Sequence, residues 1–223
     1  MRTIAVIGLK GGSGKTTVSA HVALAAHLRG MKTLVADVDP QRSASEVLKA
    51  RRGEGPKWVD ATGQNLMAAQ LAAVHGGYEA MVIDTPAGAV EEVGQAIVLA
   101  DLSLLVVRPT LMDIAAMVRT VEVVRRLKKP ALVVVNQAPA ARDGVEPPTV
   151  KRALRALEFM RLPVAPVLLR SRAVYQTALE TGRSAEEAWD DNAVAEVAAL
   201  WTFIERFAFG ARDGSKAAAI DRL

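Results

Sequence analysis

The fold of this chain is decided by the stretch Lys10-Gly11-Gly12-Ser13-Gly14-Lys15-Thr16-Thr17. A short apolar run, 4–9, precedes this stretch, and an alanine-rich run with helical spacing, 18–29, follows it. Strand, glycine-rich loop and helix in this order are the context of a phosphate-binding loop. The glycines let successive N–H groups point at one anion, and the helix N-terminus adds partial positive charge. In such a loop Lys15 would reach the β- and γ-phosphates, and the Thr16 hydroxyl would bind Mg²⁺.

One residue of the loop departs from the general pattern G-x-x-x-x-G-K-S/T, which requires glycine where this chain has Leu9. A second lysine, Lys10, lies inside the loop instead. The alternative interpretation is a glycine-rich turn with solvated lysines, and the strand and helix on either side argue against it. The loop therefore predicts nucleotide binding, and Lys10 needs an explanation of its own.

The composition is that of an ordinary globular chain. Its 223 residues suffice for one domain, and 51% of them are hydrophobic. The absence of cysteine excludes disulfides, zinc–thiolate sites and iron–sulfur clusters, and fits a reducing cytoplasm. We expect no signal peptide, because the first predicted strand begins almost at once, and no membrane-spanning helix. The net charge of +4 is mild for a nucleic-acid binder, and 4% aromatic residues argue against base-stacking platforms.

Strand and helix patterns alternate along the whole chain. After the first strand, we expect strands at 32–37, 58–61, 78–84, 102–107, 131–136 and 164–168. We expect further helices at 43–50, 65–74, 91–99, 113–127, 149–160, 173–180 and 193–209. The alternation predicts an α/β fold of the P-loop NTPase kind, with a mostly parallel twisted sheet and helices on both faces. We expect a single domain over 1–210 and a tail, 211–223, that frays or forms a weak helix.

Acidic residues end two of the predicted strands, where parallel sheets place their ligands. Asp84 follows an apolar strand in the Walker B arrangement, in which the carboxylate holds Mg²⁺, commonly through water. Asp37 and Asp39 point to the same side of an extended chain. We expect Asp39 to orient an attacking water and Asp37 to support Mg²⁺ through water. The alternatives are a simple turn at Asp84, and capping of the helix 43–50 by Asp37 and Asp39.

Three motifs in this order resemble the deviant Walker ATPases of the ParA/MinD family. They are the loop 10–17, Asp-Val-Asp-Pro-Gln at 37–41 and Ile-Asp-Thr-Pro at 83–86. The departure at Leu9 is that family's own. Since no helix-turn-helix extension precedes the loop, the chain is most similar to the short, ParF-like plasmid-partition proteins, and the stretch 170–176 also resembles that subgroup.

The resemblance implies a slow ATPase that uses ATP and Mg²⁺. Its catalytic residues would be Lys10, Lys15 and Asp39, and its metal site would comprise Thr16, Asp37 and Asp84. The nucleotide would contact Lys10, Gly11, Gly12, Ser13, Gly14, Lys15, Thr16, Thr17, Pro109 and Asn136. Asn136 could read the adenine edge or could instead belong to a turn. Pro109 lies in a segment that resembles the family's adenine-side loop, but it could simply begin a helix.

The resemblance also implies an ATP-bound, face-to-face homodimer in which Lys10 reaches the phosphates of the partner subunit. This explains the second lysine, because phosphates from another subunit offset its repulsion with Lys15. Hydrolysis, stimulated by a ParB-like centromere-binding or adaptor protein, would then release the dimer.

Members of that family bind nonspecific DNA as ATP dimers, which implies a cytoplasmic, nucleoid-associated protein without membrane binding. Basic residues outnumber acidic ones over 142–183. Our candidate DNA contacts are Lys151, Arg152, Arg155, Arg170 and Arg172. Phosphate contacts of this kind would be sequence-independent and salt-sensitive. The alternative for each charged run is a solvated helix face, and 125–129 is a second basic candidate.

The function implied is ATP-dependent DNA segregation in plasmid or chromosome partition. ParA-like positioning of a protein cargo, such as a carboxysome or a chemoreceptor cluster, would use the same ATPase. A biosynthetic ATP-dependent ligase of the same fold is disfavoured by Lys10 and the Asp39-Pro40-Gln41 segment. A MinD-like membrane protein is disfavoured because the end of the chain, 215–223, is too weakly apolar.

Overall fold

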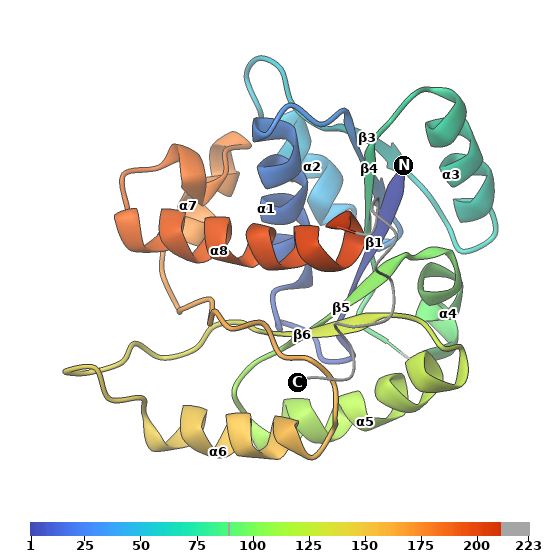
Figure 1. The fold of residues 1–223 in the computed structure, drawn as a ribbon. Helices are drawn as coiled ribbons and strands as arrows, with labels where there is room; N and C mark the ends of the chain where they lie inside the picture. The colour runs from blue at the N-terminus through green and yellow to red at the C-terminus, as the bar shows by residue number, and fades with distance from the viewer. Residues whose placement is uncertain (89, 211–223) are drawn as a thin grey trace.

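The computed structural model describes residues 1–88 and 90–210, so the expected tail, 211–223, lies outside the described residues. The described part contains a parallel sheet of six strands in the order β3-β2-β4-β1-β5-β6. The strands are β1 (Arg2–Ile7), β2 (Thr33–Asp37), β3 (Lys57–Asp60), β4 (Ala80–Asp84), β5 (Leu102–Val107) and β6 (Ala131–Val135). The sheet twists through the molecule (Figure 1). The predicted α/β fold is confirmed.

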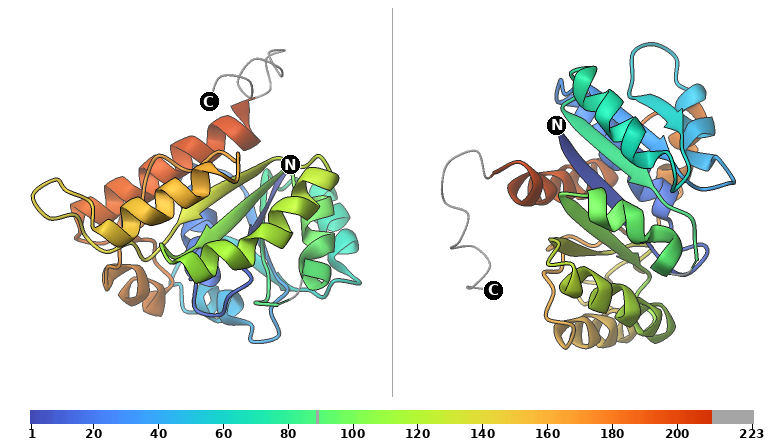
Figure 2. Two further views of the ribbon diagram at one scale, coloured as in Figure 1. Left: turned by 90° about the horizontal axis from the view of Figure 1, so that it is seen from below. Right: turned by 90° about the vertical axis from the view of Figure 1, so that its right-hand side faces the viewer.

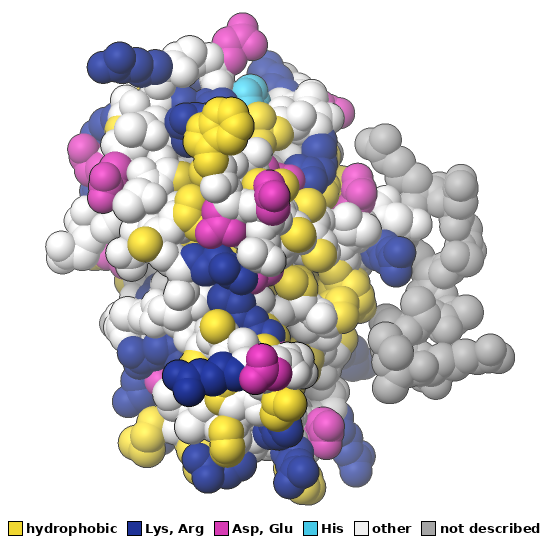
Figure 3. All heavy atoms as spheres, turned by 90° about the vertical axis from the view of Figure 1, so that its left-hand side faces the viewer, with side chains coloured by type: hydrophobic (Ala, Val, Ile, Leu, Met, Phe, Trp, Pro, Cys, Tyr) yellow, Lys and Arg dark blue, Asp and Glu magenta, His cyan; other side chains and the backbone are white. Residues whose placement is uncertain are grey.

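Helices cover both faces of this sheet (Figures 1 and 2). One face carries α1 (Lys15–Leu28), α2 (Ser43–Lys49), α7 (Val174–Thr177) and α8 (Asp191–Ala208). The other carries α3 (Leu66–His75), α4 (Val90–Leu99), α5 (Leu111–Arg126) and α6 (Pro148–Glu158). The side of the molecule that carries α7 above and α6 below mixes basic, acidic and apolar side chains, and several Lys and Arg side chains lie towards its lower end (Figure 3). No helix within the described ranges is both long and apolar enough to cross a membrane.

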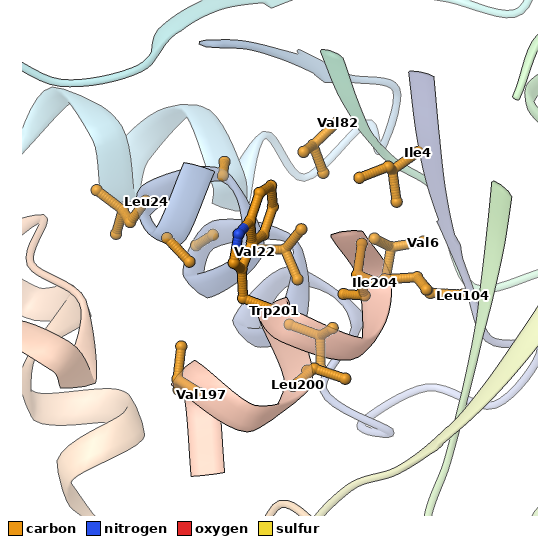
Figure 4. Packing of buried hydrophobic residues seen from close by; sticks show 14 of the residues in the cluster. Ile4, Val6, Val22, Leu24, Val82, Leu104, Val197, Leu200, Trp201 and Ile204 are labelled. Atoms are coloured by element: carbon orange, nitrogen blue, oxygen red, sulfur yellow. The ribbon is translucent and has the colours of Figure 1, made fainter. Parts of the chain in front are cut away.

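Each strand except β3 contributes to two cores because alternate side chains point to opposite faces. In β1, Ile4 and Val6 join the core under α1 and α8, whereas Ala5 and Ile7 join the core under α3 to α6. Figure 4 shows the first core, where Trp201 of α8 lies among apolar side chains of α1 and the sheet. Because both faces are covered, the five strands other than the edge strand β3 are buried along nearly their whole length.

The expected strand at 164–168 is wrong. This segment runs along the outer edge of β6 but is bridged to it at one position, Val164 with Val133, while a second isolated bridge joins Arg170 to Ala138, beyond the end of β6. The N–H groups of Ala165 and Leu169 donate to the carbonyls of Val133 and Val135, so three residues, among them Pro166, intervene where a regular parallel ladder has one. The expected helix at 173–180 is also shorter, since α7 ends at Thr177 and a 3₁₀ turn, Leu179–Thr181, follows.

Candidate nucleotide site

The predicted loop connects the end of β1 to the start of α1, beside the carboxyl ends of β4 and β5. Gly12 and Gly14 have φ angles of 75° and 87°, in the left-handed region that favours glycine. A side chain at Gly14 would also collide with the amide of Asn136. The loop therefore needs glycine at this position both for its backbone conformation and for its packing.

The two lysines of the loop lie in different environments. Lys15 begins α1 and is only 7% exposed, whereas Lys10 is exposed to solvent. Burial lowers the pKa of Lys15, and the negative charges of Asp84 and Asp39 oppose this shift. Lys15 is thus available to an anion inside the loop, while Lys10 is available to one outside the subunit.

Asp84 is hydrogen-bonded directly to side chains at the start of α1. Its carboxylate accepts hydrogen bonds from the hydroxyls of Thr16, at 2.8 Å, and Ser19, at 2.7 Å. Burial raises the pKa of Asp84 to about 7, and the nearby charge of Asp37 adds to this shift. The structure therefore brings the predicted residues Thr16 and Asp84 together. Ser19 was missed by the sequence reasoning, although its spacing from Thr16 places both hydroxyls on one helix face.

Asp37 and Asp39 contact the loop that follows β2. Asp37 is fully buried and accepts hydrogen bonds from the backbone N–H groups of Asp39, at 3.2 Å, and Ser45, at 2.9 Å. Asp39 is half-buried and accepts one from the N–H of Gln41 at 2.9 Å. The capping alternative therefore holds for Asp37, which accepts from an N–H of the first turn of α2, but not for Asp39, whose partner Gln41 precedes that helix. The expected water-mediated role of Asp37 toward Mg²⁺ stays a prediction.

The donor set of the loop fits a magnesium-bound nucleotide. The Oγ atom of Ser13 is buried and has no hydrogen-bond partner among the described residues, and it lies in the glycine-rich loop ahead of Lys15. No group of three or more His, Cys, Asp or Glu side chains that could hold a metal occurs in the described part of the chain. A magnesium ion would therefore be held by Thr16 and Asp84 together with the phosphates, rather than by a protein cage.

Two residues after β6 support the loop from the side. The buried Asn136 donates a hydrogen bond from Nδ2 to the carbonyl of Ser13, and Gln137 donates from Nε2 to the carbonyl of Gly12, both at 2.9 Å. Pro109 is buried just before Thr110, which caps the N-terminus of α5. Asn136 therefore holds the loop backbone, and its predicted contact with adenine, like that of Pro109, stays a prediction. Sequence reasoning missed the role of Gln137.

The candidate DNA contacts fall into two groups. Lys151, Arg152 and Arg155 are exposed on α6, and no ion pair is found for them among the described residues. Arg170 and Arg172 are instead paired with acidic side chains. The structure therefore leaves the α6 group more accessible to an external phosphate.

The acidic partners of this second group are Glu146 and Glu196. Arg170 donates to Glu146 through both terminal nitrogens, at 2.9 and 2.5 Å. Glu196 accepts from Nη2 of Arg172 at 2.8 Å, from the hydroxyl of Tyr175 at 2.7 Å and from the backbone N–H of Arg170 at 2.8 Å. These contacts hold the segment after the β6 edge against α8.

A parallel sheet with a glycine-rich loop after β1 and an aspartate at the end of β4 defines the P-loop class of nucleotide-binding domains. The family described as "CobQ/CobB/MinD/ParA nucleotide binding domain" matches residues 4–182. The chain therefore belongs to this family, and the predicted membership among the ParA/MinD-type proteins is confirmed.

Similar proteins agree with this assignment. The maintenance of carboxysome distribution protein A of Halothiobacillus neapolitanus is 31% identical over 201 residues, covering 82% of this chain and 85% of the relative. The protein of the same name from Gloeobacter kilaueensis is 36% identical over 125 residues, covering 54% of this chain and 55% of the relative. The ATP complex of a variant of McdA from Cyanothece has the same fold, with a TM-score of 0.76, 17% identity and coverage of 92% and 96% of the two chains.

Proposed function

We propose that this protein is an ATP-driven positioning ATPase that alternates between an ATP-bound homodimer and a monomer. The observation that carries the proposal is that the glycine-rich loop, its two lysines and Asp84 form one site. Lys15 is buried at its base, Asp84 is bonded to Thr16 and Ser19, and Lys10 is exposed at its rim. In this arrangement Lys15 would bind phosphate, Thr16 and Asp84 would bind the metal, and Lys10 would reach a second subunit.

Each side chain has a chemical task in this proposal. Lys15 neutralises phosphate charge inside the loop, and Thr16 and Asp84 hold Mg²⁺. The metal, when bound, screens the charge of the phosphates and favours attack on the terminal one. Asp39 lies at the edge of the site, near enough to Lys15 to influence its pKa, and orients the attacking water. Asp37 keeps this loop in place through its backbone contacts and supports the metal through water.

Lys10 completes the site across a dimer interface. Its side chain is exposed, and in a single subunit it adds positive charge beside Lys15. Phosphates bound by the other subunit supply the compensating charge, so the dimer is stable only while the full polyphosphate is bound. Loss of the terminal phosphate weakens this bridge and releases the subunits.

For the cargo, we favour positioning of a protein assembly on nonspecific DNA. The similarity to maintenance of carboxysome distribution protein A over most of both chains supports this choice. The exposed basic residues of α6, Lys151, Arg152 and Arg155, are the proposed phosphate contacts, and an adaptor protein bound to the cargo would stimulate hydrolysis. The second candidate is DNA segregation with a ParB-like partner, which the presence of ParA in the family description supports.

The test compares the wild type with Lys10→Ala and Lys15→Ala, using Lys128→Ala as a control at an exposed position on another face. We expect light scattering to show a dimer with ATP and Mg²⁺ and a monomer with ADP for the wild type and the control. Lys10→Ala should bind ATP but remain monomeric, and Lys15→Ala should lose ATP binding. An ATP-dependent dimer formed by Lys10→Ala would contradict the proposal. Plasmid loss in a deletion strain would favour segregation over cargo positioning.

A further inference from the structure

Arg108 is brought next to the nucleotide loop by the order of the strands. It directly follows β5, and β5 lies beside β1, with Leu105 in register with Ile7. The loop begins where β1 ends. Residues that leave β5 therefore emerge at the same edge of the sheet as the loop itself.

A buried carboxylate fixes the orientation of the Arg108 side chain. Asp113, in the first turn of α5, is 5% exposed and accepts hydrogen bonds from Nε of Arg108 at 2.8 Å and from Nη2 at 3.0 Å. It also accepts from the backbone N–H of Arg108 at 3.2 Å and from the hydroxyl of Thr110 at 3.2 Å. A guanidinium held along one edge in this way has few positions left to adopt.

The opposite edge of the guanidinium faces the loop. A Cβ atom built on Gly12 would lie 3.9 Å from Nη1 of Arg108, which places this nitrogen beside the loop backbone. Nη1 donates no hydrogen bond to any of the described residues, and the Arg108 side chain is 35% exposed. Arg108 is thus a third cation around the loop, in addition to Lys10 and Lys15.

We propose that Arg108 is a further phosphate-binding residue of the nucleotide site and that Asp113 is its positioning residue. Nη1 contacts the polyphosphate bound in the loop of the same subunit, while Nε and Nη2 stay on Asp113. The inference rests on the proposed function, because it adds a phosphate-binding residue to the same site. It differs from the sequence prediction for this segment, which named Pro109 rather than its neighbour.

The first test measures binding of ATP, ADP and inorganic tripolyphosphate by calorimetry in the presence of Mg²⁺. Arg108→Ala should bind ATP and tripolyphosphate roughly 10- to 100-fold more weakly, as expected for loss of a hydrogen bond to a charged group. Tripolyphosphate reports on the anion alone, without the base. Arg119→Ala, an exposed position on α5, is the matched control and should bind like the wild type.

A second variant separates a binding defect from a folding defect. Arg108→Ala leaves the Asp113 carboxylate buried without its partner, which can destabilise the fold by itself. The double variant Arg108→Ala/Asp113→Ala removes both charges and should stay folded by circular dichroism while still binding tripolyphosphate weakly. Asp113→Asn keeps the guanidinium but loosens its alignment, and should weaken ATP binding by a smaller factor than Arg108→Ala.

Unchanged affinity for ATP and tripolyphosphate in the folded double variant would overturn the inference. A loss confined to ATP and ADP, with tripolyphosphate unaffected, would also overturn it, since the contact would then be to the nucleoside. Binding like the wild type by Asp113→Asn would overturn the positioning role of Asp113. Failure of the wild type itself to bind ATP would instead refute the proposed function, so the two failures are distinguishable.

Discussion

Asp37 and Asp84 are register partners at the carboxyl ends of the neighbouring strands β2 and β4. Both are fully buried, yet their carboxylates make different contacts. Asp84 accepts hydrogen bonds from hydroxyls of α1, whereas Asp37 accepts them from backbone N–H groups that precede and begin α2. Asp84 thus bonds to side chains of α1, whereas Asp37, its neighbour in the sheet, holds the backbone between β2 and α2.

This difference predicts that the main effect of a substitution differs between the two positions. Asp84→Asn should remove most of the Mg²⁺ dependence of nucleotide binding, at least about tenfold in affinity, because the metal loses a charged partner. Asp37→Ala should lower the free energy of unfolding by about 2 kcal/mol, because two N–H groups lose their acceptor. Calorimetry with and without Mg²⁺, together with urea denaturation, measures both effects. If Asp37→Ala kept full stability and lost the Mg²⁺ dependence, Asp37 would act on the metal rather than on the loop.

His21 predicts an acid-sensitive component of stability. Burial lowers the pKa of His21 to about 4, while an exposed histidine in the unfolded chain has a pKa of about 6.5. As the pH falls below about 6.5 the unfolded state binds a proton that the folded state does not, so stability is lost down to the folded pKa. The loss attributable to this residue is about 3 kcal/mol.

His21→Gln should therefore show a smaller loss of stability between pH 7 and pH 4 than the wild type, measured by urea denaturation across the range. In the folded protein, the backbone N–H of Ala185 donates to Nδ1 of His21 at 3.2 Å, and Nε2 lies 3.1 Å from the carbonyl of Tyr175. The variant should accordingly be less stable at neutral pH. His75→Gln, at an exposed position, should keep the wild-type pH dependence. Parallel profiles for His21→Gln and the wild type would show that another group carries the acid sensitivity.

Asn136→Ala should weaken nucleotide binding about fivefold, because one hydrogen bond that holds the Ser13 carbonyl is lost. Fluorescence titration with labelled ATP and GTP measures the effect, and Asn192→Ala on the exposed surface of α8 is the control. An equal loss for both nucleotides would identify Asn136 as a support of the loop. A loss for ATP alone would mean that it reads the adenine edge, as the sequence predicted.

The α6 face gives a prediction for DNA binding. Lys151→Ala/Arg155→Ala should weaken ATP-dependent binding and reduce the slope of log affinity against log salt by about 2, one unit for each lost phosphate contact. Arg170→Gln/Arg172→Gln should mainly lower stability, because Glu146 and Glu196 lose their partners. Salt-titrated binding and thermal denaturation of both variants test this. Intact DNA binding in the α6 variant with loss in the folded Arg170/Arg172 variant would reverse the assignment.

The sequence was sufficient where the candidate site is built from neighbours in the chain. Gly14, Lys15 and Thr16 are consecutive at the junction of the loop and α1, and the end of an apolar strand pointed to Asp84. Contacts between distant residues could not be predicted, because they depend on which elements meet in the fold. The support of Ser13 by Asn136 and the pairing of Arg170 with Glu146 are of this kind. Pro163 and Pro166 did contain evidence against a long regular strand, since proline has a fixed φ and no N–H and is uncommon inside strands.

The proline-containing segment along β6 has a consequence for self-association. Open sheet edges can recruit a strand from another chain, which is a route to aggregation. Here the segment after α6 covers the β6 edge with an irregular backbone interrupted by Pro166. At the opposite edge, β3 is short and carries the charged residues Lys57 and Asp60. Neither edge is suited to strand addition, so we expect copies of this protein to associate through their loops and helices and to resist cross-β stacking.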